Sequence, residues 1–180
     1  MRNKIYDILK EKYKNNSNLF KHMLAVEACM SELAKYFNEN IEKWQIAGLI
    51  HDYDYLETKD NIEKHGKLTV NKFRGIVDDD ILHAVEAHSG NIERKNLMDK
   101  ALFSCDPLTG LIVASTLMHP TRKIENVDVK FVLNRFKEKR FAAGANRESI
   151  RDCETMGISL KDFIEICLNS MKAISKEIGL

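Results

Sequence analysis

The chain has 180 residues, a length that fits one domain with a single buried core. Its 28 basic and 27 acidic residues give a net charge of +1, which argues against a surface that coats nucleic acid or a membrane. An apolar content of 44% and a charged content of 31% exclude a disordered chain. Residues Met1 to Asn16 lack the apolar region of a signal peptide, and no apolar run approaches the length of about 18 residues of a membrane span. We therefore expect a cytoplasmic protein.

The cysteines do not follow the spacing of a metal or disulfide framework. Cys29, Cys105, Cys153 and Cys167 are widely separated, and no two of them form a close pair. Free cysteine is among the most buried residue types in folded proteins. We interpret all four as reduced residues of the core.

Apolar residues recur at steps of three and four, and the chain has only two prolines, a pattern that predicts helices nearly everywhere. The first helix is expected from Arg2 to Lys14. The second is expected after Ser17, which we take as its N-cap. A third runs from about Ile41, and its final segment Ile46–Ile50 is apolar on all sides. This segment is expected to be the most buried part of the domain.

The remaining chain continues the helical pattern. Further helices are predicted at 62–74, 79–89, 96–105, 107–118 and 128–140. The last helix opens at Ser159, where Asp162 completes a variant of the capping box. Small residues make Phe141–Asn146 a predicted loop. The sequence thus predicts one all-α domain over residues 1–180, built as a helical bundle.

Helix phase separates the six histidines. His22 shares a face with Val26 and Leu33, and His88 shares one with Ile81 and Val85, so both are expected to point inward. His83 lies five residues before His88, about 140° away around a helix, and is expected to face elsewhere. His119 precedes Pro120, where a helix tends to end. An inward histidine can equally be an ordinary core residue.

Three further positions complete the candidate set. His51 and Asp52 follow the apolar end of the third predicted helix, where the two side chains can share a metal. Asp106 precedes Pro107, so an N-cap explains this pair as well as a ligand does. His65 precedes Gly66 and can be either a ligand or an exposed helix-start residue. Imidazole and carboxylate together suit iron, manganese, zinc, cobalt or nickel.

The order of these residues resembles the HD superfamily of metal-dependent phosphohydrolases. The matching segments after His51-Asp52 are Lys64-His65-Gly66, Ala87-His88-Ser89-Gly90 and Ser104-Cys105-Asp106. They are most similar to the two-metal subset, such as bacterial HD-domain hydrolases of diadenosine tetraphosphate. The stretch 101–110 and the tail beyond Asp128 are similar to a prokaryotic clade of HD hydrolases. The resemblance covers about 18–118, with the C-terminal helices 128–180 expected to pack on this core.

The resemblance implies a ligand set and a cofactor. It makes His22, His51, Asp52 and Asp106 the ligands of one divalent metal. His65 and His88 would hold a second ion, with Asp52 as the bridge. Transition metals are expected, and magnesium is an alternative. The residues after the motif differ from the Ile-Gly common in the family, which bears on the choice of substrate.

The expected reaction is hydrolysis of a small phosphoester, such as a nucleotide, by metal-activated water. Asp54 is a candidate to orient that water or accept its proton, and a solvated loop carboxylate is the alternative. Basic residues near the ligands or the small-residue loop are candidates for the phosphate site: Arg140, Arg147, Lys64, Lys67 and Lys123.

Two other functions use the same residues. An HD-fold di-iron oxygenase, similar to myo-inositol oxygenase, would employ the same ligands. A non-catalytic nucleotide-binding protein would keep the fold without turnover. The sequence leaves these alternatives open, and it leaves both a monomer and a homodimer open.

Overall fold

The computed structural model describes all 180 residues, and every regular element in it is a helix. The N-terminal half consists of α1 (Arg2–Lys12), α2 (Ser17–Tyr36), α3 (Ile41–Ile50), α4 (Tyr55–Thr58), η1 (Ile62–Lys64), α5 (Lys67–Phe73) and α6 (Asp79–Ala87). The second half consists of α7 (Leu97–Met118), η2 (Ile124–Asn126), α8 (Val129–Lys137), α9 (Arg147–Arg151), η3 (Asp152–Met156), α10 (Leu160–Ala173) and α11 (Ser175–Ile178). The predicted all-α fold is confirmed.

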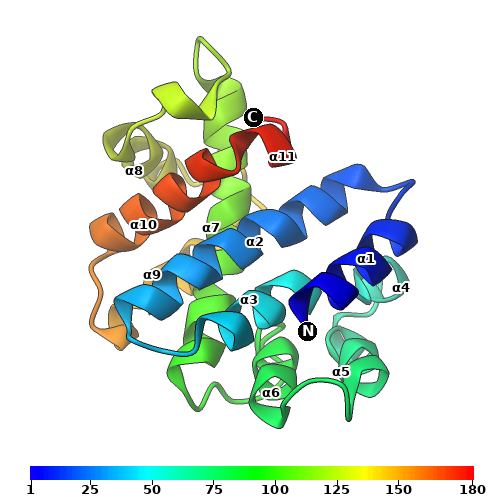
Figure 1. The fold of residues 1–180 in the computed structure, drawn as a ribbon. Helices are drawn as coiled ribbons and strands as arrows, with labels where there is room; N and C mark the ends of the chain where they lie inside the picture. Colours follow the sequence, from blue (N-terminus) through cyan, green and yellow to red (C-terminus); the bar gives the residue numbers. More distant parts are fainter.

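The long helices α2, α7 and α10 form the centre of the domain. Figure 1 shows α2 and α10 crossing α7, with α1 and α3 against α2 and with α5 and α6 at one end. A single apolar cluster extends through the molecule from Ile5 to Ile178. The C-terminal helix α10 contacts α2, α7 and α8, so the tail and the N-terminal helices share this core.

Helix α3 lies closest to α2. Its residues from Ile46 to Ile50 are all buried, as the sequence predicts. Gly48 permits this close packing, because a Cβ atom at this position would lie only 2.8 Å from the Cα atom of Glu27. The tight contact places the C-terminal end of α3, and with it His51, beside the middle of α2.

The expected break at Pro107 is wrong. Helix α7 is continuous from Leu97 to Met118, with Pro107 inside it, and its N-cap is Asn96 in a capping box with Asp99. A proline in a helix interior removes one backbone hydrogen bond, and flanking tertiary packing must hold the helix together there. Asp106 is therefore an interior helix residue and not an N-cap. This result removes the capping explanation for Asp106.

Because α7 is continuous, its length and apolar composition must also be compared with those of a membrane span. Helix α7 is the one helix long and apolar enough to cross a membrane by length and composition, with a mean hydropathy of 1.5 over its best window. The sequence prediction missed it because a helix divided at Pro107 would be too short. More than half of that window is buried within the domain, as expected for a central core helix, so the feature is weak evidence for a membrane span.

Other boundaries differ from the predicted ones in detail. The N-cap of α2 is Asn16, whose side chain accepts from the amide of Leu19, and Ser17 is the first helical residue. The predicted helix 62–74 is divided into η1 and α5, with Gly66 at a φ of +85° between them. Left-handed backbone favours glycine, so the chain turns there instead of continuing the helix. The predicted loop 141–146 is followed by α9, a short helix that the sequence analysis did not predict.

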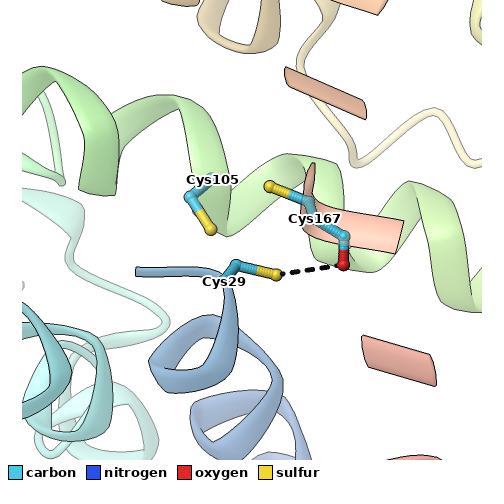
Figure 2. A group of neighbouring side chains, drawn as sticks. All are labelled: Cys29, Cys105 and Cys167. Atoms are coloured by element: carbon cyan, nitrogen blue, oxygen red, sulfur yellow. Dashed lines mark hydrogen bonds between the residues drawn. The ribbon is translucent and has the colours of Figure 1, made fainter. Parts of the chain in front are cut away.

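Three of the four cysteines meet where α2, α7 and α10 pack together. Figure 2 shows the side chains of Cys29, Cys105 and Cys167 directed toward one another, with the Cys29 thiol donating to the Cys167 carbonyl at 3.5 Å. Their sulfur atoms all lie within 4.8 Å of one another, and all four cysteines are free and buried. Burial raises the pKa of the Cys105 thiol well above its usual value, which favours the neutral form. At Cys29 burial would raise the pKa, but the hydrogen bonds with Cys105 and Cys167 outweigh it and lower the pKa to about 5. The prediction of unpaired cysteines in the core agrees with the structure.

Candidate metal centre and pocket

The six predicted ligands come from five separate segments and converge on one place. His22 lies in the first half of α2, and His51 and Asp52 directly follow α3. The other three are His65 after η1, His88 after α6, and Asp106 in the middle of α7. His51, Asp52, His65 and His88 are buried, whereas the His22 and Asp106 side chains remain 25% and 32% exposed. The partly exposed pair marks the side that is open to solvent.

Four of the residues form a first group of donor atoms. The Nε2 atom of His22 lies 3.0 Å from Asp106 Oδ1, 3.5 Å from Asp52 Oδ2 and 3.2 Å from His51 Nε2. His51 Nε2 lies 3.5 Å from Asp52 Oδ2 and 3.9 Å from Asp106 Oδ1. Two imidazole nitrogens and two carboxylate oxygens thus face one another across a small space.

Asp52 connects this group to a second one. Its other oxygen, Oδ1, lies 3.1 Å from His65 Nε2 and 3.7 Å from His88 Nε2, and these two nitrogens are 3.1 Å apart. His51 and His88 also pack edge to face, with ring centroids 5.1 Å apart. The two groups are therefore adjacent, and each oxygen of Asp52 serves one of them.

Every imidazole in the cluster is held through its Nδ1 atom. His51 Nδ1 donates to the Gly48 carbonyl at 2.7 Å, and His88 Nδ1 donates to the Val85 carbonyl. His65 Nδ1 faces Asp54 Oδ1 at 2.9 Å. Because carbonyl and carboxylate oxygens only accept, these contacts place a proton on Nδ1 and make Nε2, which faces Asp52, the nitrogen that would bind a metal.

The His22 ring is also held through its Nδ1 atom, in this case by a hydroxyl group. Its Nδ1 atom lies 3.2 Å from Thr109 Oγ1, and that hydroxyl donates to the Asp106 carbonyl at 2.9 Å. The hydroxyl oxygen is therefore left to accept from Nδ1–H. Metal-bound histidines commonly have their second nitrogen engaged in this way, which fixes the orientation of the ring. The sequence analysis missed Thr109, although it lies one helical turn after Asp106.

The cluster strongly perturbs the acidity of its members. Burial would lower the pKa of His22, but the Asp106 carboxylate outweighs it and raises the pKa to about 9. Burial would also lower the pKa of His65, but the carboxylates of Asp52 and Asp54 outweigh it and raise the pKa to about 9. Burial would raise the pKa of Asp52, but the neighbouring imidazoles hold it well below its usual value. Without a cation, protons must compensate the carboxylates.

The donor set fits divalent metal ions. Around an ion with bonds of about 2.0–2.2 Å, neighbouring donor atoms lie about 2.8–3.6 Å apart, and most of the distances above fall in that range. Nitrogen and oxygen donors together suit iron, manganese, zinc, cobalt or nickel. Two overlapping triads, His22-His51-Asp106 and His51-Asp52-His88, meet the geometric requirements for holding an ion.

Asp54 does not have the surroundings predicted for a residue that orients water. Both of its oxygens are occupied, because they accept from His65 Nδ1 and from the amides of Gly66, Leu68 and Thr69 at 2.9–3.1 Å. Its side chain is 1% exposed and does not line the pocket. These contacts make Asp54 a positioning residue that orients His65 and holds the start of α5.

None of the predicted phosphate-binding cations lines the pocket at the centre. The Arg147 guanidinium donates to backbone carbonyls of the 135–145 segment, among them Phe136, Ala142 and Ala145 at 2.6–3.2 Å. It thus holds the small-residue loop in place and is not free for a ligand. Arg140, Lys64, Lys67 and Lys123 are exposed and do not line the pocket. These residues are near the ligands or the small-residue loop along the chain, but their proximity in sequence does not make them part of the pocket wall.

A pocket of about 490 Å³ opens onto the cluster. It is lined by Leu19, His22, Asp52, Tyr55, Ile62, His65, His88, Ser89, Phe103, Asp106, Pro107, Gly144, Asn146 and Ser149. The small-residue loop and α9 thus form one wall, and Gly144 of this loop, which was expected to let a phosphate group approach the backbone, lines the pocket. A larger cavity of about 920 Å³ lies between α2 and α10 and contains none of the six predicted ligands.

The two remaining histidines lie outside the cluster, as helix phase predicts for His83 and as Pro120 predicts for His119. His83 Nδ1 is 2.9 Å from Asp99 Oδ2. His119 is at the end of α7, where its Nδ1 atom is 2.9 Å from Thr121 Oγ1.

The fold and the centre define a class: an all-helical protein in which histidines and aspartates from five segments surround a bridging carboxylate. The model of the HD domain family matches residues 19–131, more than half of the chain, so the protein belongs to the HD domain family. Members of this family bind divalent metals and are generally metal-dependent phosphohydrolases. No curated protein and no solved structure matches the chain.

Proposed function

We propose that this protein is a two-metal phosphohydrolase that acts on a nucleotide or another small phosphoester. The observation that carries the proposal is the shared arrangement of four histidines, each held through Nδ1 and directing Nε2 toward Asp52. Ordinary core histidines have no reason to direct four Nε2 atoms toward one carboxylate while each Nδ1 atom is engaged elsewhere. Metal coordination accounts for all four at once.

The six ligand residues would hold two ions. His22, His51, Asp106 and one oxygen of Asp52 would hold one ion, while His65, His88 and the other oxygen of Asp52 would hold the second. Such ions, when bound, lower the pKa of water toward neutrality and stabilise charge on a phosphoryl group. The partly exposed His22 and Asp106 lie at the pocket, so a phosphate group would approach from that side.

The test is turnover by metal-reconstituted protein. The proposal predicts release of phosphate or of a nucleoside monophosphate from a panel of nucleotides and aryl phosphoesters with manganese, iron, cobalt, nickel, zinc or magnesium. Asp52→Ala should lose activity and most bound metal while keeping its helical circular dichroism. His83→Ala is the matched control and should keep both, because His83 faces Asp99 at 2.9 Å and contacts none of the six ligands.

Two results would overturn the proposal in favour of other functions. Oxygen consumption by the iron-loaded protein, with no phosphate release, would indicate an oxygenase with the same ligands. Nucleotide binding with no turnover under any metal would indicate a non-catalytic binding protein.

A further inference from the structure

The wall of the pocket beyond the metal-ligand cluster is neutral. Its apolar part consists of Leu19, Tyr55, Ile62, Phe103 and Pro107. The polar part consists of uncharged Ser89, Asn146 and Ser149. No lysine or arginine lines the pocket, and its only charged side chains belong to the ligand cluster.

Arg94, which stacks on a residue of the pocket wall, is engaged elsewhere. The Arg94 guanidinium carbon lies 3.8 Å from the centre of the Phe103 ring, and its Nε atom lies 3.4 Å from Asp152 Oδ2. Arg94 thus stacks on a pocket residue without lining the pocket, and Asp152 offsets its charge. Arg147 is equally committed, because its guanidinium binds the carbonyls of the loop. Neither arginine is free to pair with a second phosphate group.

Two apolar side chains at the pocket remain open to solvent. Tyr55 is 42% exposed and Ile62 is 58% exposed, and both line the pocket. Burying them against the organic part of a ligand would be favourable. On the opposite wall, Asn146 Oδ1 caps α9 by accepting from the amides of Glu148 and Ser149. Its amide group and the Ser149 hydroxyl therefore remain as neutral hydrogen-bonding groups.

Phosphate chains are ordinarily held by arginine, lysine or arrays of backbone amides, because each phosphate group carries charge that must be compensated. In this pocket the metal centre can compensate one phosphate group. A second or third group would lie against apolar or neutral side chains, and moving a charge out of water without a partner is unfavourable.

We infer that the pocket selects phosphoesters with a single phosphate group and a neutral, partly apolar organic part, and discriminates against di-, tri- and tetraphosphates. This inference rests on the proposed hydrolase function and sharpens it. It also separates this chain from the dinucleoside tetraphosphate hydrolases that its ligand order resembles. Ile62 and Ser149 are the specificity-determining positions, one on the apolar wall and one on the polar wall.

The experiment compares adenosine mono-, di- and triphosphate and diadenosine tetraphosphate with the metal-reconstituted protein at fixed free metal. We expect kcat/KM for the monophosphate to exceed that for the triphosphate by about tenfold or more, since one uncompensated charged hydrogen bond corresponds to about 1.5–3 kcal/mol. Calorimetric binding of non-hydrolysable phosphonate analogues should show the same order. This second measurement does not depend on turnover.

Two variants test the walls of the pocket. Ser149→Lys should raise the triphosphate-to-monophosphate ratio of kcat/KM by about tenfold, because it adds a cation beside the phosphate path. Asn169→Lys, an exposed site on α10 outside this pocket, is the matched control and should leave the ratio unchanged. Ile62→Ser should lower the preference for adenosine monophosphate over glycerol phosphate, whose organic part is small and polar.

The outcomes separate the two proposals. Turnover with a preference for tri- or tetraphosphates by the unmodified protein would leave the hydrolase function standing and overturn the inference. An unchanged ratio in Ser149→Lys would overturn it as well. Absence of turnover with every metal and every phosphoester would overturn the hydrolase function and the inference together.

Discussion

Asp54→Asn tests how the centre is held together, because this carboxylate touches no pocket and acts only through His65 and α5. Each carboxylate oxygen accepts from at least two donors, at 2.9 and 3.1 Å on Oδ1 and at 3.0 and 3.1 Å on Oδ2. An amide keeps one oxygen and turns an NH2 group toward two amide donors. Two buried N–H groups then lose their acceptor, at about 1–3 kcal/mol each.

The resulting loss of about 2–6 kcal/mol is a substantial part of the stability of a domain, yet it leaves the chain folded. For a chain of this length it corresponds to a fall in Tm of about 5–20 °C. The oxygen that Asn keeps toward His65 Nδ1 is a neutral acceptor in place of a carboxylate, and a change in such a supporting contact typically weakens metal binding about 10–100-fold. The weakening should concern the ion held by His65 and His88 more than its neighbour.

Thermal denaturation and a metal titration against a competing chelator measure both effects of Asp54→Asn. Asp60→Asn, an exposed carboxylate in the same segment, is the matched control and should change neither. The reasoning is refuted if Asp54→Asn keeps both the Tm and the two metal affinities of the parent protein. A uniform loss of both affinities would also contradict it, because the contacts reach the centre only through His65.

Four further predictions concern packing, protons and the loop. Gly48→Ala should destabilise the domain by about 1–3 kcal/mol in a denaturant titration, because the added methyl group overpacks α3 on α2. Gly110→Ala, in open space on α7, is the control and should be neutral or stabilising. Equal effects of the two substitutions would contradict the close approach of α3 to α2. Metal binding at pH 7 should release about two protons, because His22 and His65 have a pKa of about 9 without metal and must become neutral to coordinate. Calorimetry in buffers of different ionisation enthalpy measures this release, and its absence would contradict the proton assignment. Because both pKa values lie above the unfolded value of about 6.5, the metal-free protein should lose stability as pH rises from about 6.5 through 9, and a Tm that rises over this range would show the sign to be wrong. Arg147→Lys should cost about 1–3 kcal/mol, since an ammonium group cannot reach the carbonyls that the guanidinium binds, and an unchanged Tm would contradict that structural role.

Much of the fold could be predicted from the sequence because helical periodicity is local information. The apolar segment Ile46–Ile50, the inward phase of His22 and the direction of His83 away from that of His88 all follow from spacing alone. Pro107 misled the prediction, because its effect on a helix depends on packing that spacing does not reveal. In the structure, α7 passes through Pro107 and carries Asp106 toward His22.

The candidate ligands could be selected from their order, whereas their supporting contacts could not. Asp54 is two residues from Asp52, but its contact with His65 spans eleven residues and depends on the turn at Gly66. Arg147 lies beside a small-residue loop, which suggested a phosphate site. Its guanidinium instead donates hydrogen bonds to backbone carbonyls of that loop. Long-range side-chain direction decides these roles, and no local pattern encodes it.

The most direct test of the central claim is X-ray diffraction from manganese-soaked crystals at the manganese absorption edge. The account predicts two anomalous peaks flanking Asp52, one within coordination distance of His22, His51 and Asp106 and the other near His65 and His88. Crystals that show no peak beside Asp52, while manganese is present in the drop at millimolar concentration, would contradict the claim that these histidines form a metal centre.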